Sequence, residues 1–261
     1  MSKIKFEVAS SDKIAEFIFD LKDSLEEKAL EQRSGSPCIF VSLEPEIKKK
    51  LFNTKILTED IKKGLKEIAE KKLNEKKQDL QKFKKEIENY WINVEKIYFN
   101  ELEKNIPIDF EKEYICYVNN CVVSSYFNNN EISLIYFEEF SKLLKREEKQ
   151  KLLSEISFII AEEILHLIYF KYWRKIFGLN INYNEIFDIG SDDYSAWHIA
   201  EILPEFLLVE NPIFTKFGWG KINRAKKGYF WIPKIKEKLD PLWRNKKNFK
   251  DFLIKAHKEI I

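Results

Sequence analysis

An apolar stretch at residues 156–170 constrains this chain more than any other feature of its sequence. It reads Ile-Ser-Phe-Ile-Ile-Ala-Glu-Glu-Ile-Leu-His-Leu-Ile-Tyr-Phe, which is apolar on nearly every side of a helix. We therefore expect a buried helix over about residues 151–176. Its centre nevertheless carries Glu162, Glu163 and His166. Burying ionisable groups is costly unless a partner or a metal compensates, so the stretch predicts a site with a chemical or structural role.

The totals describe a globular chain without a dominant charge. Of its 261 residues, 44% are apolar and 34% are charged, and the net charge is +2. This balance gives no general case for an acidic or nucleic-acid partner. Cys38, Cys116 and Cys121 form no CxxC pair, which favours a reduced, cytoplasmic compartment. We find no signal-peptide pattern in residues 1–20 and no uncharged apolar run of about 18 residues, so we expect no membrane partner.

Residues 1–105 predict a mainly helical N-terminal portion that includes a long helix. Short strands are expected over residues 3–8 and 38–43, and a long helical region begins after Thr58, a plausible N-cap. Apolar residues then recur at a 3-4-3-4-3 spacing: Leu80, Phe83, Ile87, Tyr90, Val94 and Ile97. The seam covers less than three heptads, so we expect it to pack within its own domain and not against a partner coil.

Residues 106–261 predict an α+β portion, continuous with the first in one globule. Three β-rich runs, at 114–118, 122–126 and 132–136, are separated by asparagines that suit hairpin turns, which predicts a small antiparallel or mixed sheet, in its simplest form a meander. The buried helix follows, and Gly178 is a good stop for it. After a loop, a second helix is expected from Tyr194 to about Leu208, ended or kinked by Pro204.

The chemistry-bearing residues fall on these two helices. Glu162 and His166 are four residues apart and share one helix face, while Glu163 lies one turn before His166. On the second helix, Glu201 is flanked by Ile199, Ala200, Ile202 and Leu203, which indicates burial. His198 lies on roughly the same face, and it either replaces Glu201 as a ligand or orients it.

These residues, within about residues 80–210, resemble the zincin metallopeptidases of the gluzincin type. In that family an HExxH helix follows a sheet, and a Glu from a later helix completes a zinc site. Here the motif is Glu162-Glu163-Ile164-Leu165-His166. The resemblance implies that Glu162, His166 and Glu201 are metal ligands and that Glu163 is the general base. It further implies hydrolysis of a peptide or protein substrate, held as an added strand along residues 132–136.

Glu162 is the point at which the sequence departs from the family pattern. Two carboxylate ligands would cancel the charge of the metal and weaken the nucleophile that it generates. Hard ligands also relax the preference for zinc towards manganese or iron. The alternative is a relic in which no metal binds and Glu162 pairs with His166. The chain is then an inactive interaction or structural protein on a decayed zincin scaffold.

Other functional classes have less support. A di-iron bundle needs two ExxH motifs, and only Glu163-x-x-His166 is present. The C-terminal region has basic residues interleaved with aromatic ones, a pattern that single-stranded nucleic acid can use; we favour a solvated surface with aromatics packed inward. These basic residues are Lys221, Arg224, Lys226, Lys227, Lys234, Lys236, Lys238, Arg244, Lys246, Lys247 and Lys250. Neither a GxSxG motif nor a phosphate-binding loop occurs.

Overall fold

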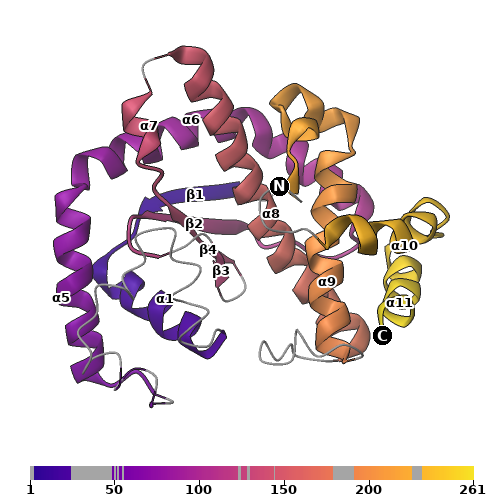
Figure 1. The fold of residues 1–261 in the computed structure, drawn as a ribbon, viewed down its shortest axis with the longest axis horizontal. Helices are drawn as coiled ribbons and strands as arrows, with labels where there is room; N and C mark the ends of the chain where they lie inside the picture. The colour runs from indigo at the N-terminus through magenta and orange to yellow at the C-terminus, as the bar shows by residue number, and fades with distance from the viewer. Residues whose placement is uncertain are drawn as a thin grey trace. The chain divides into compact units, whose positions relative to one another are not determined.

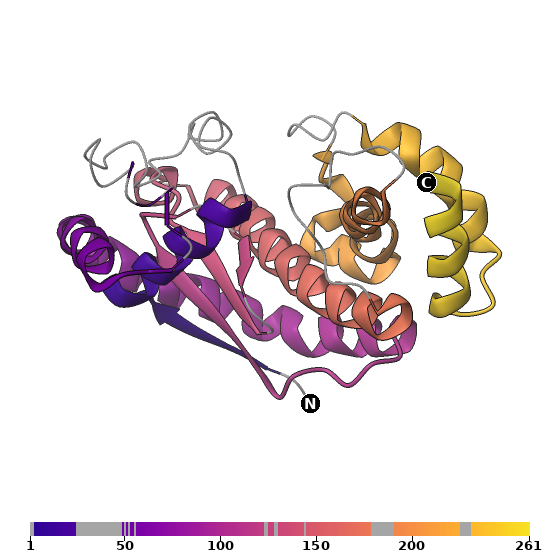
Figure 2. The same ribbon diagram turned by 90° about the horizontal axis from the view of Figure 1, so that it is seen from below.

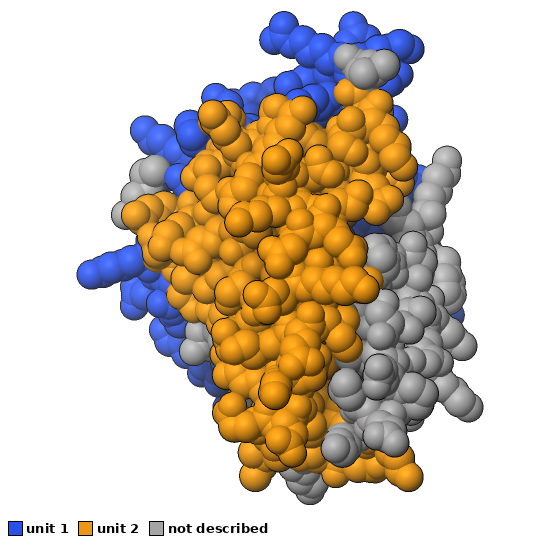
Figure 3. Space-filling model, turned by 90° about the vertical axis from the view of Figure 1, so that its left-hand side faces the viewer, with its two compact units in different colours: residues 1–2, 90–112, 145–261 blue, residues 3–89, 113–144 orange. Residues whose placement is uncertain are grey.

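The computed structural model is mostly helical, with one small sheet (Figure 1). It describes residues 3–24, 49, 51, 53–54, 56–122, 125–127, 130–143, 145–178, 191–224 and 231–261. The chain divides into two compact units, which Figure 3 shows in different colours. Unit 1 comprises residues 1–2, 90–112 and 145–261, and unit 2 comprises residues 3–89 and 113–144. The domain boundary expected after residue 105 stays a prediction.

Unit 2 contains the sheet, whose strands lie in the order β1-β2-β4-β3. They are β1 (Lys3–Val8), β2 (Glu113–Asn119), β3 (Ser125–Phe127) and β4 (Glu131–Ile135). β1 pairs with β2 and β2 pairs with β4 in parallel, whereas β3 runs antiparallel to β4. Side chains from three strands share one buried face: Ile4, Phe6, Tyr114, Cys116, Val118, Ile132 and Leu134.

The predicted antiparallel meander is therefore wrong, although the sheet is mixed and the α+β class is confirmed. The cause is β2, which pairs with the distant β1 and with β4 and not with its neighbour in sequence, β3. The β2 side of β4 is paired from Glu131 to Ile135, and on the β3 side only Glu131, Ile132 and Ser133 are paired among the described residues. The expectation that residues 132–136 receive a peptide strand stays a prediction, and β3 already occupies part of that edge.

Helices complete unit 2 (Figures 1 and 2). They are α1 (Ser11–Ser24), α5 (Glu59–Glu75), the first part of α6 (Lys77–Asn105), and the short α7 (Glu139–Lys142). Against the sheet, Phe17 of α1 packs edge to face on Tyr117 of β2, with ring centroids 5.6 Å apart. The predicted seam of α6 is buried at Leu80, Phe83 and Ile87, which places the start of this long helix in the core of its own chain.

Unit 1 is helical. Besides the second part of α6 it contains α8 (Arg146–Phe177), α9 (Asp192–Pro204), α10 (Ile232–Arg244) and α11 (Phe249–Ile260). Three short turns of helix lie between α9 and α10, namely the π-helix η1 (Glu205–Val209) and the 3₁₀ helices η2 (Pro212–Phe217) and η3 (Trp219–Lys221). None of the helices in the described part of the chain is long and apolar enough to cross a membrane.

Two sequence expectations lie outside the described residues: the strand over 38–43 and most of the loop over 179–192. The strand over residues 3–8 is confirmed as β1, and the helix stop at Gly178 is confirmed by its left-handed backbone, with φ of 70°. Pro204 also acts as expected, because α9 ends there and the chain continues as the wider π-helix.

Candidate functional site

The site is built on α8, which the sequence makes long and buried. Acidic Glu147 and Glu148 occupy its first turn and basic Arg174 and Lys175 its last, where each sign of charge is favoured by the helix dipole. Between these polar ends, the side chains from Ile156 to Trp173 are mostly buried on all sides. The helix therefore carries any ionisable group at its centre into the core of unit 1.

The second helix, α9, brings a further carboxylate to α8. Ser191 caps its N-terminus by accepting a hydrogen bond from the backbone N–H of Tyr194. The two helices contact each other, and the hydroxyl of Tyr169 on α8 donates a hydrogen bond to the backbone carbonyl of Ala196 on α9, at 2.9 Å. This bond fixes the part of α9 that leads to Glu201.

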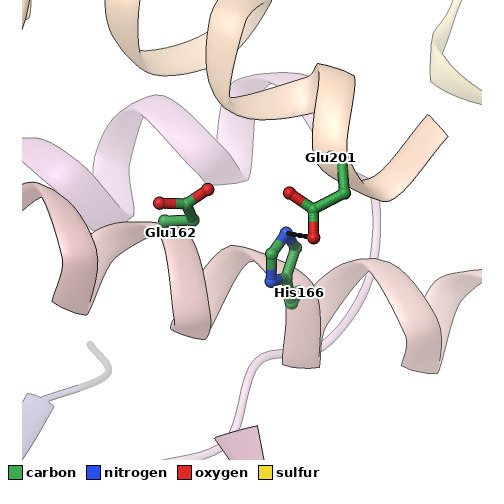
Figure 4. A group of neighbouring side chains, drawn as sticks. All are labelled: Glu162, His166 and Glu201. Carbon is green, nitrogen blue, oxygen red and sulfur yellow. Dashed lines mark ion pairs between the residues drawn. The ribbon is translucent and has the colours of Figure 1, made fainter. Parts of the chain in front are cut away.

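Glu162, His166 and Glu201 converge between these helices, as Figure 4 shows. Each offers one potential ligand atom, and these atoms all lie within 4.8 Å of one another. Nε2 of His166 lies 3.9 Å from Oε1 of Glu201. All three residues are at least nine-tenths buried. The three predicted ligands thus form a buried group of a kind that can hold a metal ion.

Glu163 lies beside this group. Its Oε2 atom is 3.7 Å from Nδ1 of His166, on the side of the imidazole ring away from Nε2. Its side chain is 16% exposed, against 12% for the side chain of Glu162 and 8% for that of Glu201. Glu163 is therefore the most exposed of these three carboxylates.

A buried arginine, Arg224, completes the group. One guanidinium nitrogen, Nη2, donates to Oε1 of Glu162 and, at 2.6 Å, to Oε2 of Glu201. The other, Nη1, donates to the backbone carbonyl of Glu201 and lies 3.8 Å from Oε1 of Glu205. Arg224 is only 3% exposed. The partner of Glu162 is therefore an arginine, and the expected alternative of a pair between Glu162 and His166 gives way to this ion pair.

The concentration of carboxylates shifts the protonation of the group. Burial raises the pKa of Glu162 to about 7, opposed by Arg224 and aided by Glu201. Burial alone would lower the pKa of His166, but Glu201, Glu163 and Glu162 together raise it to about 9. Both shifts favour the protonated form, so they reduce the negative charge of the buried group.

His198 lies outside the group. Its Nδ1 atom is hydrogen-bonded to the backbone carbonyl of Tyr194 at 2.7 Å, and its ring packs against Tyr194 and Trp231. Burial lowers its pKa, whereas Glu201 acts in the opposite direction. Of the two alternatives on α9, Glu201 is thus the residue that joins Glu162 and His166.

Four aromatic residues of α8 and α9 pack within unit 1. Phe158 meets Trp219, Tyr172 meets Phe249, and Trp197 meets Trp231; Tyr169 bonds α9 as described above. In the basic C-terminal region, Trp243 stacks on Phe206 at 5.0 Å. These contacts agree with aromatics that pack inward.

The donor set fits a divalent cation. Two carboxylates and an imidazole are ordinary ligands for zinc, manganese or iron. Each carboxylate gives one oxygen to Arg224 and has a second oxygen, so the chemistry of the set allows a metal even though the guanidinium is close to it.

Sequence reasoning missed Arg224 because nothing local marks it. It lies among many basic residues, and we expected that region to be a solvated surface. The one signal was indirect: Glu162, Glu201 and Glu205 all fall on strongly apolar helices, and buried carboxylates require a buried cation. The chain offers 45 lysines and arginines, so this requirement could not select one.

Comparison with known proteins finds no match for this chain among family models, curated proteins or solved structures.

Proposed function

We propose that unit 1 holds a divalent metal through Glu162, His166 and Glu201, and that the protein is a metal-dependent hydrolase of the zincin type. The observation that carries this proposal is the convergence of the three buried ligand side chains within 4.8 Å, from two helices. A solvated helix face would not bury two glutamates and a histidine together, because their desolvation needs compensation.

When bound, a divalent metal supplies Lewis acidity at this point of the chain. Glu162, His166 and Glu201 would hold it, and Nε2 of His166 lies 3.9 Å from Oε1 of Glu201. Glu163 is the candidate base for the attacking water, because it is the most exposed of the three carboxylates and lies beside His166, where its Oε2 atom faces Nδ1 and not Nε2 of the ring. The zincin resemblance makes a peptide bond the substrate, with zinc as the first metal to test and manganese and iron next.

A second candidate function is a metal-free, non-catalytic protein on a zincin-like scaffold. The hydrogen bonds from Arg224 to both Glu162 and Glu201 favour it, because they satisfy the two carboxylates without any metal. In this case the group stabilises unit 1, and the protein acts through its surface.

Metal content and turnover test the first proposal. Purified protein loaded with zinc, manganese or iron(II) is analysed for bound metal and for cleavage of an unstructured protein such as casein. We expect Glu201→Ala to lose metal and turnover, and Glu163→Gln to keep metal but lose turnover. Glu147→Gln, an exposed change on the same helix, is the control and should retain both. Bound metal that stays at background level at every metal concentration, and that Glu201→Ala does not change, would contradict the metal centre and favour the second candidate function.

A further inference from the structure

Arg224 contacts the same two carboxylates that would bind the metal, and it does so with a single atom. Nη2 reaches both Glu162 and Glu201, the latter at 2.6 Å. Nη2 thus holds one oxygen of each of the two carboxylates that a shared metal would need. It also brings a positive charge next to the oxygens that remain for the metal.

The charge of Arg224 cannot be removed to make room. A guanidinium stays protonated under all ordinary conditions, so acid or base does not release it. Two cations in one buried site repel each other strongly, because little water is present to screen them. The site therefore favours either the guanidinium of Arg224 bound to the two carboxylates or a metal bound to them, but not both together.

We infer that Arg224 competes with a divalent metal for Glu162 and Glu201, so that this arginine sets the metal affinity of the site. The inference rests on the proposed metal centre. It also gives Glu162 a specific role, because a glutamate at this position, unlike a histidine, provides a charge that can pair with the arginine in the absence of metal.

Glu205 offers the displaced guanidinium an alternative partner. Its Oε1 atom is 3.8 Å from Nη1 of Arg224, is buried, and makes no hydrogen bond in the part of the chain that the structure describes. A small shift of the guanidinium towards Glu205 would satisfy this oxygen. It would also free oxygens of Glu162 and Glu201 for a metal, so Glu205 aids metal binding without being a ligand.

Zinc titration of the metal-stripped, full-length protein tests the competition. Partners of metal ligands typically alter metal affinity by about 10- to 100-fold, and a competing cation acts against the metal because like charges repel. We expect Arg224→Met to raise zinc affinity by about that factor over the unsubstituted protein, and Glu205→Gln to lower it. Arg244→Met is the matched control, since Arg244 is an exposed arginine of the same unit and is paired with Asp240. The zinc affinity of this variant should equal that of the unsubstituted protein.

A second pair of variants covers the case in which Arg224→Met does not fold. Glu162→His removes one buried carboxylate, so its combination with Arg224→Met leaves less uncompensated charge. We expect the double variant to bind zinc more tightly than Glu162→His alone, because Arg224 still holds Glu201 in the single variant. Circular dichroism and thermal melting establish that each variant is folded.

The outcomes separate the inference from the proposed function. Equal zinc affinity with and without Arg224, in both backgrounds, overturns the competition but leaves the metal centre intact. Zinc binding that appears only when Arg224 is replaced supports the competition, and it assigns the natural chain to the metal-free candidate function. An absence of zinc binding in all variants, including the double variant, overturns both.

Discussion

Arg224 holds Glu201 at two points, donating from Nη1 to its backbone carbonyl and from Nη2 to its carboxylate, the latter at 2.6 Å. A guanidinium is planar and rigid, so two contacts to one residue fix its orientation. That orientation directs Nη2 to Glu162 on the neighbouring helix as well. One arginine thereby joins α8, α9 and the segment after η3 within unit 1.

In metal-free protein, Arg224→Met should be strongly destabilising. Removing one partner of a buried ion pair leaves uncompensated charge and costs about 3–5 kcal/mol of the free energy of unfolding. Denaturant unfolding monitored by tryptophan fluorescence measures this change. The exposed pair at Arg244 is the control, and Arg244→Met should have little effect. Equal losses from the two substitutions would show that the buried cluster does not stabilise unit 1.

The hydrogen bond between Tyr169 and Ala196 should matter for metal binding as well as for stability. Tyr169→Phe removes a buried bond that joins the two ligand-bearing helices. Tyr98→Phe removes a similar bond, at 2.6 Å, from α6 to Ala161 of α8. Each substitution should cost about 1 kcal/mol of unfolding free energy.

Zinc titration then separates these two tyrosine variants. We expect only Tyr169→Phe to weaken zinc binding. Of the two tyrosine hydrogen bonds, the one from Tyr169 joins α9 to α8, whereas the one from Tyr98 joins α6 to α8. A similar loss of zinc affinity in Tyr98→Phe would mean that general loosening of α8, and not the α8–α9 link, controls the site.

His257 should make unit 1 less stable in acid. It lies on α11, with Nδ1 2.5 Å from Oγ of Ser195 and Nε2 3.2 Å from Asp192 at the start of α9. Burial lowers its pKa below the ordinary value of 6.5, although Asp192 opposes the shift. The unfolded chain then binds the proton more readily than the folded one. The contribution of His257 is therefore fully present above pH 6.5 and is lost as the pH falls through the lowered pKa.

Unfolding free energies measured between pH 7 and pH 5 test this expectation through the difference between variants. His257→Gln should lose less stability over that range than the unsubstituted protein. Lys258→Gln, a change at the exposed neighbouring position, should follow the unsubstituted protein. A steeper loss of unfolding free energy in His257→Gln than in the unsubstituted protein would mean that folding does not lower the pKa of His257.

Asn119 should be the most sensitive polar residue of the sheet. Its side-chain oxygen accepts hydrogen bonds from the backbone N–H groups of Cys121 and Val122, and its amide donates to Ser133 at 2.8 Å. Asn119→Ala leaves these buried groups unpaired and should cost about 3 kcal/mol of unfolding free energy.

The neighbouring Asn120 provides the comparison for Asn119. Its side chain donates one hydrogen bond, to the backbone carbonyl of Lys72 at 2.9 Å, and accepts a weak one from the thiol of Cys121 at 3.5 Å. Asn120→Ala should therefore cost only about 1 kcal/mol in the same denaturant experiment. A cost for Asn119→Ala no greater than this would show that the turn after β2 rearranges freely.

The positions of α8 and α9 could be read from the sequence, whereas the pairing of the strands could not. Apolar periodicity and end signals such as Gly178 and Ser191 act within a few residues, so they were sufficient for α8 and α9. The runs that became β2 and β4 were visible too. β2 pairs in parallel with β1, which comes from the beginning of the chain, and on its other side with β4, and no local signal encodes these partners.

The candidate site divides in the same way. Four-residue spacing on a helix puts Glu162 and His166 on one face in any fold, and the apolar flanks of Glu201 predicted its burial; both follow from the sequence alone. Tertiary structure decided that Glu201 and not His198 meets them, and that Arg224 pairs with both glutamates. The physical reason is that a long, flexible arginine is positioned by the charges that fold around it, not by its neighbours along the chain.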